Sequence, residues 1–166
     1  PPGRPGAAAG GADEAVPVSA GGPGAGFGDG GGAEPPQPGL ADLLDLLARV
    51  RAAGLPVAYA GTGNPVRVGA ATGLAVYRLV QESLTNTLKH AGPGAAARVE
   101  LAWTGPELVV EVRDDGRGPV SAGTGGQGLV GMRERVALAG GTTAAGIGPD
   151  GGFRVTARLP VPGGAR

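Results

Sequence analysis

Apolar residues recur at helical spacing in three stretches of the chain. The first stretch covers residues 39–53, and its apolar side contains Leu40, Leu43, Leu44, Leu47 and Val50. The second, residues 71–90, is the longest, and its candidates for burial include Leu74, Tyr77, Leu84 and Leu88. The third covers residues 129–140. These patterns predict three amphipathic helices, and glycine and proline residues after the first two predict where those helices end.

Shorter segments alternate between apolar and polar residues, which predicts β-strands. They cover residues 57–61, 98–104, 107–114, 142–148 and 153–160, and residues 66–69 form a further short candidate. The strands do not alternate regularly with the helices along the chain. This order favours an α+β fold, a two-layer sandwich in which helices cover one face of a mixed sheet.

The first 38 residues differ in composition from the rest of the chain. They consist almost wholly of glycine, alanine and proline, with Val16, Val18 and Phe27 as their only larger apolar side chains. Such a segment cannot bury enough apolar surface to offset its chain entropy. We therefore expect a disordered linker over residues 1–38, one folded domain over residues 39–161 and a disordered tail over residues 162–166.

Charge and cysteine content narrow the classes of function. Fourteen basic and fourteen acidic residues cancel, so no bulk electrostatic field recruits nucleic acid or an anionic membrane. The absence of cysteine excludes disulfides and thiolate metal sites, and it fits a reducing cytoplasm. No apolar run approaches the roughly 20 residues that span a bilayer. Because the chain begins with Pro1 and its only methionine is Met132, we expect it to be a piece of a longer protein.

One side of the predicted long helix is strongly polar. Glu82, Asn86 and His90 are spaced by four residues, with Arg78 a turn earlier and Lys89 alongside. A solvated helix face is the common explanation of such a pattern. However, asparagine is a weak helix former, so its place within the helix needs a reason. An amide oxygen and a carboxylate four residues apart suit a hard cation that keeps most of its waters, as magnesium does when it binds nucleotides.

His90 is the only histidine of the chain. It could be a phosphoacceptor, a metal ligand or a polar neighbour of a bound nucleotide. A single histidine without cysteines cannot build a zinc site. Its place at the end of the polar helix face favours a contact with the ligand over a role as the phosphorylated group.

Two aspartates and two glycines lie at the end of the third predicted strand and directly after it. Asp114, Asp115, Gly116 and Gly118 belong to the segment "DDGRG", which taken alone is typical of a surface turn. A carboxylate at a strand end could instead accept a hydrogen bond from the exocyclic amine of adenine. The neighbouring glycines would let the base approach the backbone, since they carry no Cβ.

A second glycine segment leads into the last predicted helix. Gly126, Gly128 and Gly131 precede or begin this helix, and backbone N–H groups at a helix start attract anions such as phosphate. The pattern is weak by itself. It matches neither the dinucleotide-binding fingerprint, which follows a strand, nor the P-loop, which ends in Gly-Lys-Ser/Thr.

In this order the three segments resemble the ATP-binding catalytic domain of bacterial sensor histidine kinases, in the superfamily shared with gyrase, Hsp90 and MutL. The segment "VYRLVQESLTNTLKHA" resembles the N box of this family. The segments "DDGRG" and "GQGLVGMRERV" resemble its first and second glycine boxes. The resemblance covers residues 36–161 and implies the Bergerat ATP-binding fold. The form of the N box, the last segment and "PQPGLADL" resemble the subfamily whose response regulators carry NarL/LuxR-type DNA-binding domains.

The resemblance also implies roles for individual residues. Asn86 would ligate magnesium, Glu82 would orient or activate the attacking group, and Asp114 would bind the adenine amine. Further residues near the nucleotide would be Lys89 and His90 beside the phosphates, Gly116 and Gly118 at the adenine pocket, and Thr156 beside the adenine. Gly126, Gly128 and Leu129 would form the hinge of a short lid over residues 119–127, which is expected to be mobile when empty.

In the kinases that the chain resembles, the γ-phosphoryl group passes to a histidine on a separate dimerising hairpin, and from there to a response regulator. Residues 1–38 contain neither a histidine nor an amphipathic helix. The chain is therefore expected to bind Mg-ATP, to be monomeric and not to phosphorylate itself. The resemblance further implies a cytoplasmic domain of a membrane-bound sensor, without direct nucleic-acid binding.

Two other functions share these boxes. One is a stand-alone serine kinase of the anti-sigma type, against which "GMRERV" counts. The other is an ATP-binding interaction module without turnover, which the intact boxes make the weaker alternative.

Overall fold

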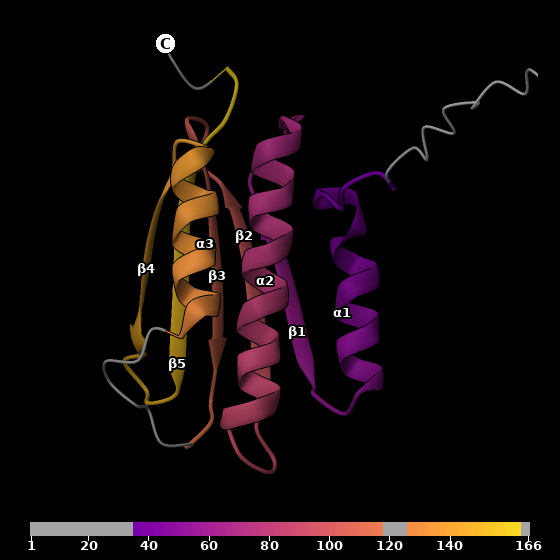
Figure 1. Cartoon of the computed structure of the whole chain (residues 1–166), viewed down its shortest axis with the longest axis vertical. Coiled ribbons are helices and arrows are strands. Elements are labelled where there is room, and N and C mark those ends of the chain that lie inside the picture. Colours follow the sequence, from indigo (N-terminus) through magenta and orange to yellow (C-terminus); the bar gives the residue numbers. More distant parts are fainter. Residues whose placement is uncertain (1–34, 118–125, 164–166) are drawn as a thin grey trace, which may run out of the picture. The chain divides into compact units, whose positions relative to one another are not determined.

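A computed structural model describes residues 35–117 and 126–163 (Figure 1). Its helices are η1 (Leu40–Asp42), α1 (Leu43–Ala52), α2 (Ala70–His90) and α3 (Gln127–Leu138). Its strands are β1 (Val57–Thr62), β2 (Ala97–Trp103), β3 (Glu107–Asp114), β4 (Thr142–Ile147) and β5 (Phe153–Pro160). Nearly all of the expected linker lies outside the described residues, as do Gly118, most of the expected lid and the end of the expected tail.

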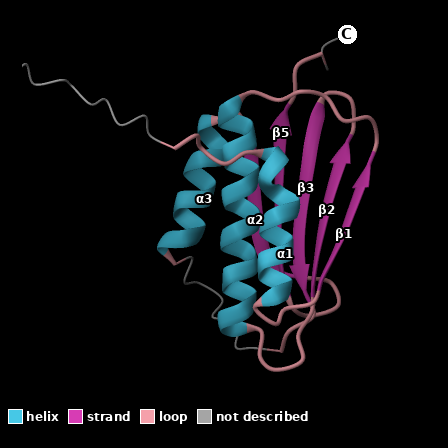
Figure 2. Ribbon diagram, turned by 90° about the vertical axis from the view of Figure 1, so that its right-hand side faces the viewer, coloured by secondary structure: helices cyan, strands magenta, loops and turns pink. Residues whose placement is uncertain are grey.

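The strands form one mixed sheet in the order β1-β2-β3-β5-β4. β1 and β2 are parallel, and the other neighbouring pairs are antiparallel. The three α-helices lie on the same face of the sheet, as Figure 2 shows, with α2 between α1 and α3 (Figure 1). The predicted α+β sandwich with helices on one face of a mixed sheet is therefore confirmed.

The core lies between the helices and the central strands. On β3, alternate residues Leu108, Val110 and Val112 are buried, because successive side chains of a strand point to opposite faces. The side chains that α2 buries most deeply are Val76, Leu79, Val80 and Leu84. Each such aliphatic side chain contributes about 1.5–3 kcal/mol relative to an exposed one. This packing holds the end of β3 beside the second half of α2.

Most of the predicted elements agree with the structure, with differences of up to two residues at their ends. The candidate strand at residues 66–69 is wrong, because these residues form no strand before α2 begins. Among the described residues, no helix is both long and apolar enough to cross a membrane.

Two leucines predicted on apolar helix faces are exposed. Leu44 is 60% exposed, and Leu46 is buried in its place. Leu88 is 45% exposed, because the buried stripe of α2 continues through Ser83 and Thr87 instead. Near its end, α2 therefore directs the hydroxyl side chain of Thr87, rather than Leu88, into the protein.

Candidate functional site

Asp114 ends β3 with a carboxylate on the helix-covered face. Asp114 lies two residues after Val112, so it continues the alternate positions Leu108, Val110 and Val112 that face the core. Its Oδ1 accepts hydrogen bonds from the backbone N–H groups of Gly116, at 2.9 Å, and Phe153, at 3.2 Å. Its Oδ2 accepts a hydrogen bond from the hydroxyl of Thr87 on α2, at 3.1 Å. Donors from three segments of the chain thus hold this carboxylate.

Two glycines allow the backbone to close around Asp114. Gly152 has a φ of 66°, and a Cβ at this position would lie 2.0 Å from the carbonyl oxygen of Asp114. Gly116 lies against Ala91 at the end of α2, and its Cβ would come within 2.4 Å of the Ala91 Cβ. A side chain at either position would displace backbone. Asp114, the first aspartate of "DDGRG", therefore lies between close backbone contacts at Gly152 and at Gly116.

The polar face of α2 borders Thr87, the helix residue that donates to this carboxylate. Asn86 immediately precedes Thr87, and it is half-buried, as is Glu82 one turn earlier. Lys89 and His90 are exposed at the end of the helix. Within residues 35–117 and 126–163, the side chains of these four residues make no hydrogen bond to another residue. Unlike Asp114, these four side chains are not held by hydrogen bonds within the described residues.

The start of α3 packs against the same part of α2. A Cβ on Gly128 would lie 2.0 Å from Glu82 Oε1, so the absence of a side chain leaves room for the Glu82 carboxyl group. One turn into α3, Met132 is buried, and its Sδ lies 3.9 Å from the Ser83 hydroxyl. Leu129 packs against the core, whereas Gly126 before the helix has open space around its Cβ position. The second glycine segment thus adjoins the polar face of α2.

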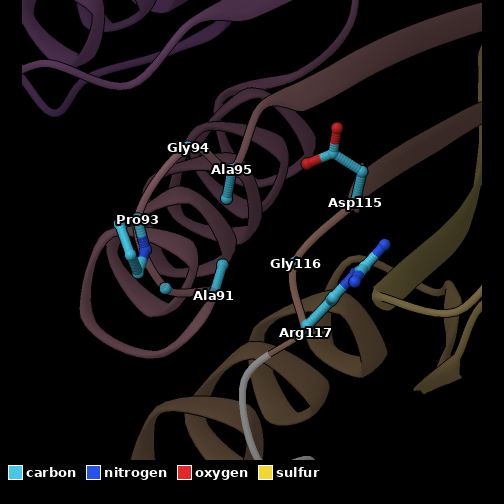
Figure 3. A pocket seen from close by; sticks show the side chains of 8 residues that line it. Ala91, Pro93, Gly94, Ala95, Asp115, Gly116 and Arg117 are labelled. Carbon is cyan, nitrogen blue, oxygen red and sulfur yellow. The ribbon is translucent and has the colours of Figure 1, made fainter.

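A hollow of about 310 Å³ adjoins Gly116, beside the end of α2 (Figure 3). It is lined by residues 91–95, in the loop after α2, and by residues 115–117. Asp115 Oδ1 accepts the N–H of Ala96 at 2.7 Å, and the N–H of Arg117 donates to the Ala91 carbonyl at 3.2 Å. These bonds tie the loop to the glycine segment. None of Glu82, Asn86 and Asp114 lines this hollow.

The sequence-predicted residues divide into those that the fold brings together and those that it does not. Seven lie around the second half of α2: Glu82, Asn86, Lys89, His90, Asp114, Gly116 and Gly128. Gly126 and Leu129 lie at the start of α3, next to Gly128. Gly118 lies outside the described residues.

The prediction that Thr156 lies beside the adenine is wrong. On β5, Val155 and Ala157 are buried, so Thr156 between them faces away from the helices. It pairs with Glu111, three residues before Asp114 and on the opposite face of the sheet. Thr156 therefore does not approach the site on the helix side. The β5 group that does reach it is the backbone N–H of Phe153.

Sequence reasoning missed Thr87, although a signal for it was present. Thr87 follows Asn86 and lies four residues after Ser83, so the two hydroxyl side chains share one side of α2. A polar stripe inside a helix that packs on a sheet indicates a buried hydrogen-bond partner. That partner, Asp114, lies 27 positions further along the chain and became identifiable only in the fold.

Comparison with protein families gives a match over residues 71–163 to the model described as "Histidine kinase-, DNA gyrase B-, and HSP90-like ATPase". The sensor histidine kinase LnrJ of Bacillus subtilis (strain 168) is 34% identical over 127 residues, which are 75% of this chain and 31% of that protein. The signal transduction histidine-protein kinase/phosphatase UhpB of Salmonella typhimurium (strain LT2) is 41% identical over 87 residues, 51% of this chain and 17% of that protein. The chain thus spans less than a third of the length of these relatives.

Solved structures of histidine kinases also resemble the chain. The histidine kinase domain of the blue-light activated histidine kinase from Erythrobacter litoralis is 27% identical, with a TM-score of 0.59, covering 73% of this chain and 60% of that chain. The nucleotide-free catalytic domain of the histidine kinase ThkA is 16% identical, with a TM-score of 0.56, covering 72% of this chain and 92% of that chain. At that identity, the second likeness shows the fold alone.

Proposed function

The chain belongs to the family of histidine kinase-, DNA gyrase B- and HSP90-like ATPases, and we propose that it delivers the γ-phosphoryl group of Mg-ATP to a histidine on a separate hairpin of a two-component sensor kinase. The observation that carries the proposal is the pairing of two unlike groups at one end of α2. Asp114 is held rigidly by three donors, and Asn86, next to its donor Thr87, makes no side-chain hydrogen bond within the described residues.

Asp114 is the proposed contact for adenine. Its Oδ1 already accepts two backbone N–H groups, whereas its Oδ2 accepts only the Thr87 hydroxyl among the described residues. A carboxylate oxygen has two lone pairs, so Oδ2 retains capacity for the exocyclic amine of the base. Gly116, which carries no Cβ, would let the ring approach the backbone beside it.

Asn86 is the proposed magnesium ligand, and its surroundings fit that role. Magnesium favours oxygen ligands and keeps several waters while it binds phosphate oxygens, so one protein amide can suffice. Among the described residues, no group of three or more His, Cys, Asp and Glu could hold a metal by itself. The proposal therefore relies on the nucleotide to complete the site, where the ion would neutralise phosphate charge.

The remaining polar groups surround the phosphates in this proposal. Glu82 would orient the attacking histidine, and Lys89 and His90 at the end of α2 would face the triphosphate. Backbone N–H groups at the start of α3 would attract the phosphates, with Gly126, Gly128 and Leu129 as the hinge of the lid. Phosphoryl transfer depends chiefly on positioning and charge neutralisation, which these groups could supply together.

The partners in this proposal follow from the relatives. Both LnrJ and UhpB are histidine kinases by name, and the chain matches only part of each. We propose that the histidine hairpin belongs to the rest of the parent protein and that a NarL/LuxR-type response regulator receives the phosphoryl group. The domain itself would act as a monomer on the cytoplasmic side of a membrane-bound sensor.

Calorimetric titration with Mg-ATP tests the nucleotide-binding part of the proposal. The chain is expected to bind Mg-ATP, and EDTA is expected to weaken this binding because Asn86 would hold a magnesium ion that neutralises phosphate charge. The Asn86→Ala variant serves as the matched protein control. An absence of heat at millimolar nucleotide would contradict the whole proposal.

Transfer is tested by adding a hairpin from a related kinase together with ATP labelled in its γ-phosphate. Acid-labile label on the hairpin histidine is the expected result. Acid-stable phosphoserine on a partner protein would favour an anti-sigma-type kinase instead. Nucleotide binding without any transfer, in the presence of a hairpin that a known catalytic domain phosphorylates, would favour the non-catalytic module.

A further inference from the structure

Thr87 is a buried hydroxyl residue between the two ends of the proposed nucleotide site. Thr87 is 5% exposed, and it lies on α2 directly after Asn86. Its Oγ1 lies 3.1 Å from Asp114 Oδ2 and also 3.1 Å from the carbonyl oxygen of Ser83, one turn earlier. A threonine hydroxyl has one proton to donate, so the two acceptors compete for it.

The carboxylate is the stronger of these two acceptors. A hydrogen bond to an ionised group is roughly twice as strong as one between neutral groups. The Ser83 carbonyl lies within α2, where the helix backbone already supplies it with a donor. The proton of the Thr87 hydroxyl is therefore directed mainly at Asp114 Oδ2.

This bond limits how Asp114 can meet a ligand. The N–H groups of Gly116 and Phe153 occupy Oδ1, so Oδ2 is the oxygen with remaining acceptor capacity. With Thr87 on one lone pair of Oδ2, the second lone pair has a fixed direction. A carboxylate whose protein partners are all donors presents only acceptor capacity, which suits an exocyclic amine and opposes a carbonyl oxygen.

We propose that Thr87 is a positioning residue that sets the preference of this site for a base with an exocyclic amine at C6. It acts through Asp114, by holding Oδ2 in one orientation relative to α2 and therefore relative to the neighbouring Asn86. This inference rests on the proposed function, because it requires that Asp114 contact the base. It assigns to α2 a role at the adenine end of the site as well as at the metal end.

The test compares Thr87→Val, Thr87→Ser and the unchanged chain in calorimetric titrations with Mg-ATP and Mg-ITP. Inosine carries a carbonyl at C6 where adenine carries the amine. Valine keeps the shape of threonine without its hydroxyl, and the expected result is a Kd for Mg-ATP about tenfold higher, the size of one hydrogen bond to a charged group. The Kd for Mg-ITP should change less than about twofold, so discrimination falls. The Thr87→Ser variant keeps the hydroxyl and should discriminate between the two nucleotides as the unchanged chain does.

The matched control is Thr85→Val, on the same helix and half-buried, with no side-chain hydrogen bond in the described part of the chain. It should leave both dissociation constants within about twofold. Thermal melting of each variant reports the fold separately. A merely structural Thr87 would lower the melting temperature and weaken both nucleotides equally, and that outcome would overturn the inference.

The same titrations separate the two proposals. Suppose that the unchanged chain binds Mg-ATP and that Thr87→Val prefers Mg-ATP over Mg-ITP by the same factor as the unchanged chain. The inference is then wrong, and the proposed function stands. If the unchanged chain binds no Mg-ATP, both are wrong. If Thr87→Val fails to fold, Thr87→Ser decides, because loss of discrimination in the serine variant would contradict a role for the hydroxyl.

Discussion

The two faces of the sheet use charged residues differently. On the helix-covered face, β3 continues Leu108, Val110 and Val112 with Asp114, whose carboxylate accepts three hydrogen bonds. On the open face, the charged residues of β3, β2 and β5 form a network of ion pairs. They are Arg113–Glu100 and Arg113–Glu111 at 3.8 Å, Arg154–Glu111 at 3.5 Å, Arg158–Glu107 at 3.4 Å, and Arg98–Glu100. One strand therefore supplies both a fixed single charge and part of an exposed network.

The difference lies in what replaces water around each charge. The paired side chains of the open face are between 22% and 57% exposed, and such pairs contribute between 0 and about 1 kcal/mol each. Asp114 is half-buried, and two of its donors are backbone groups that need an acceptor. The face on which a charge lies, rather than the charge itself, therefore distinguishes a site from a solvated surface.

The largest effect is expected for Asp114→Ala. It removes the proposed contact for adenine and leaves three donors without their acceptor. We expect Mg-ATP binding to weaken about 100-fold or more, since a site loses strongly when a buried polar partner is missing. The free energy of unfolding should fall by about 2–3 kcal/mol, as measured by urea denaturation.

The matched control for Asp114 is Arg113→Ala, one residue earlier and on the open face. It should change the free energy of unfolding by less than about 1 kcal/mol and leave nucleotide binding unaltered. Unchanged discrimination between ATP and GTP in Asp114→Ala would contradict the role of this carboxylate in binding the base.

Asn86→Ala should affect binding without affecting the fold. The side chain is half-buried and makes no hydrogen bond within the described residues, so the free energy of unfolding should change by less than about 0.5 kcal/mol. Magnesium-dependent nucleotide binding should be lost, as measured by titration with and without EDTA. A collapse in the thermal stability of the nucleotide-free protein would instead make Asn86 structural.

Gly128→Ala should have a smaller effect, confined to the contact between α2 and α3. The new Cβ would meet Glu82 Oε1, the far end of a flexible side chain, so the carboxyl group is expected to move. Alanine is also the better helix former by about 1 kcal/mol, which offsets part of the strain. Mg-ATP binding should weaken by roughly threefold to tenfold, the effect of displacing one polar contact.

Gly131→Ala provides the control in the first part of the same helix, since its Cβ would meet only the end of the flexible Arg135 side chain, at 3.2 Å. It should leave Mg-ATP binding close to that of the unchanged chain. Equal weakening by both substitutions would indicate an effect on the helix start itself, and would count against displacement of Glu82.

The smallest effect is expected on the open face, from Glu100→Gln. A hydrogen bond from the Arg98 side chain lowers the pKa of Glu100 from its usual 4.5. Because the folded pKa is depressed, the pair stabilises the fold above the unfolded pKa, and this contribution is lost as pH falls through the folded value. At neutral pH the substitution should cost less than about 1 kcal/mol.

Urea denaturation of Glu100→Gln and the unchanged chain, at neutral and acidic pH and at low and high salt, measures this contribution. The difference should shrink in acid and in high salt, because salt screens exposed charges. Mg-ATP binding should be unaffected. A large difference that persisted in high salt would show that the open-face network is more than a solvated surface.

Local sequence patterns were sufficient to predict most of the helices and strands and part of the candidate site. The helical spacing of Glu82 and Asn86 places both on one face of α2 wherever that helix packs, since residues four apart share a face. Alternation along β3 likewise places Asp114 in the series of Val110 and Val112. The same rule places Thr156 in a series with Arg154 and Arg158, so its orientation was predictable from β5, whereas the family resemblance had suggested a contact with adenine.

The sequence by itself therefore determined which residues form helices and strands and which side chains share a face, because both properties depend on neighbours a few positions away. Only the tertiary structure decided that Thr87, rather than Leu88, is buried in α2, and that its hydroxyl meets Asp114. It also brought the Phe153 N–H to the same carboxylate and the Glu82 carboxyl group to Gly128. These contacts join segments between 27 and 46 residues apart, and their formation depends on how the sheet and helices pack as a whole.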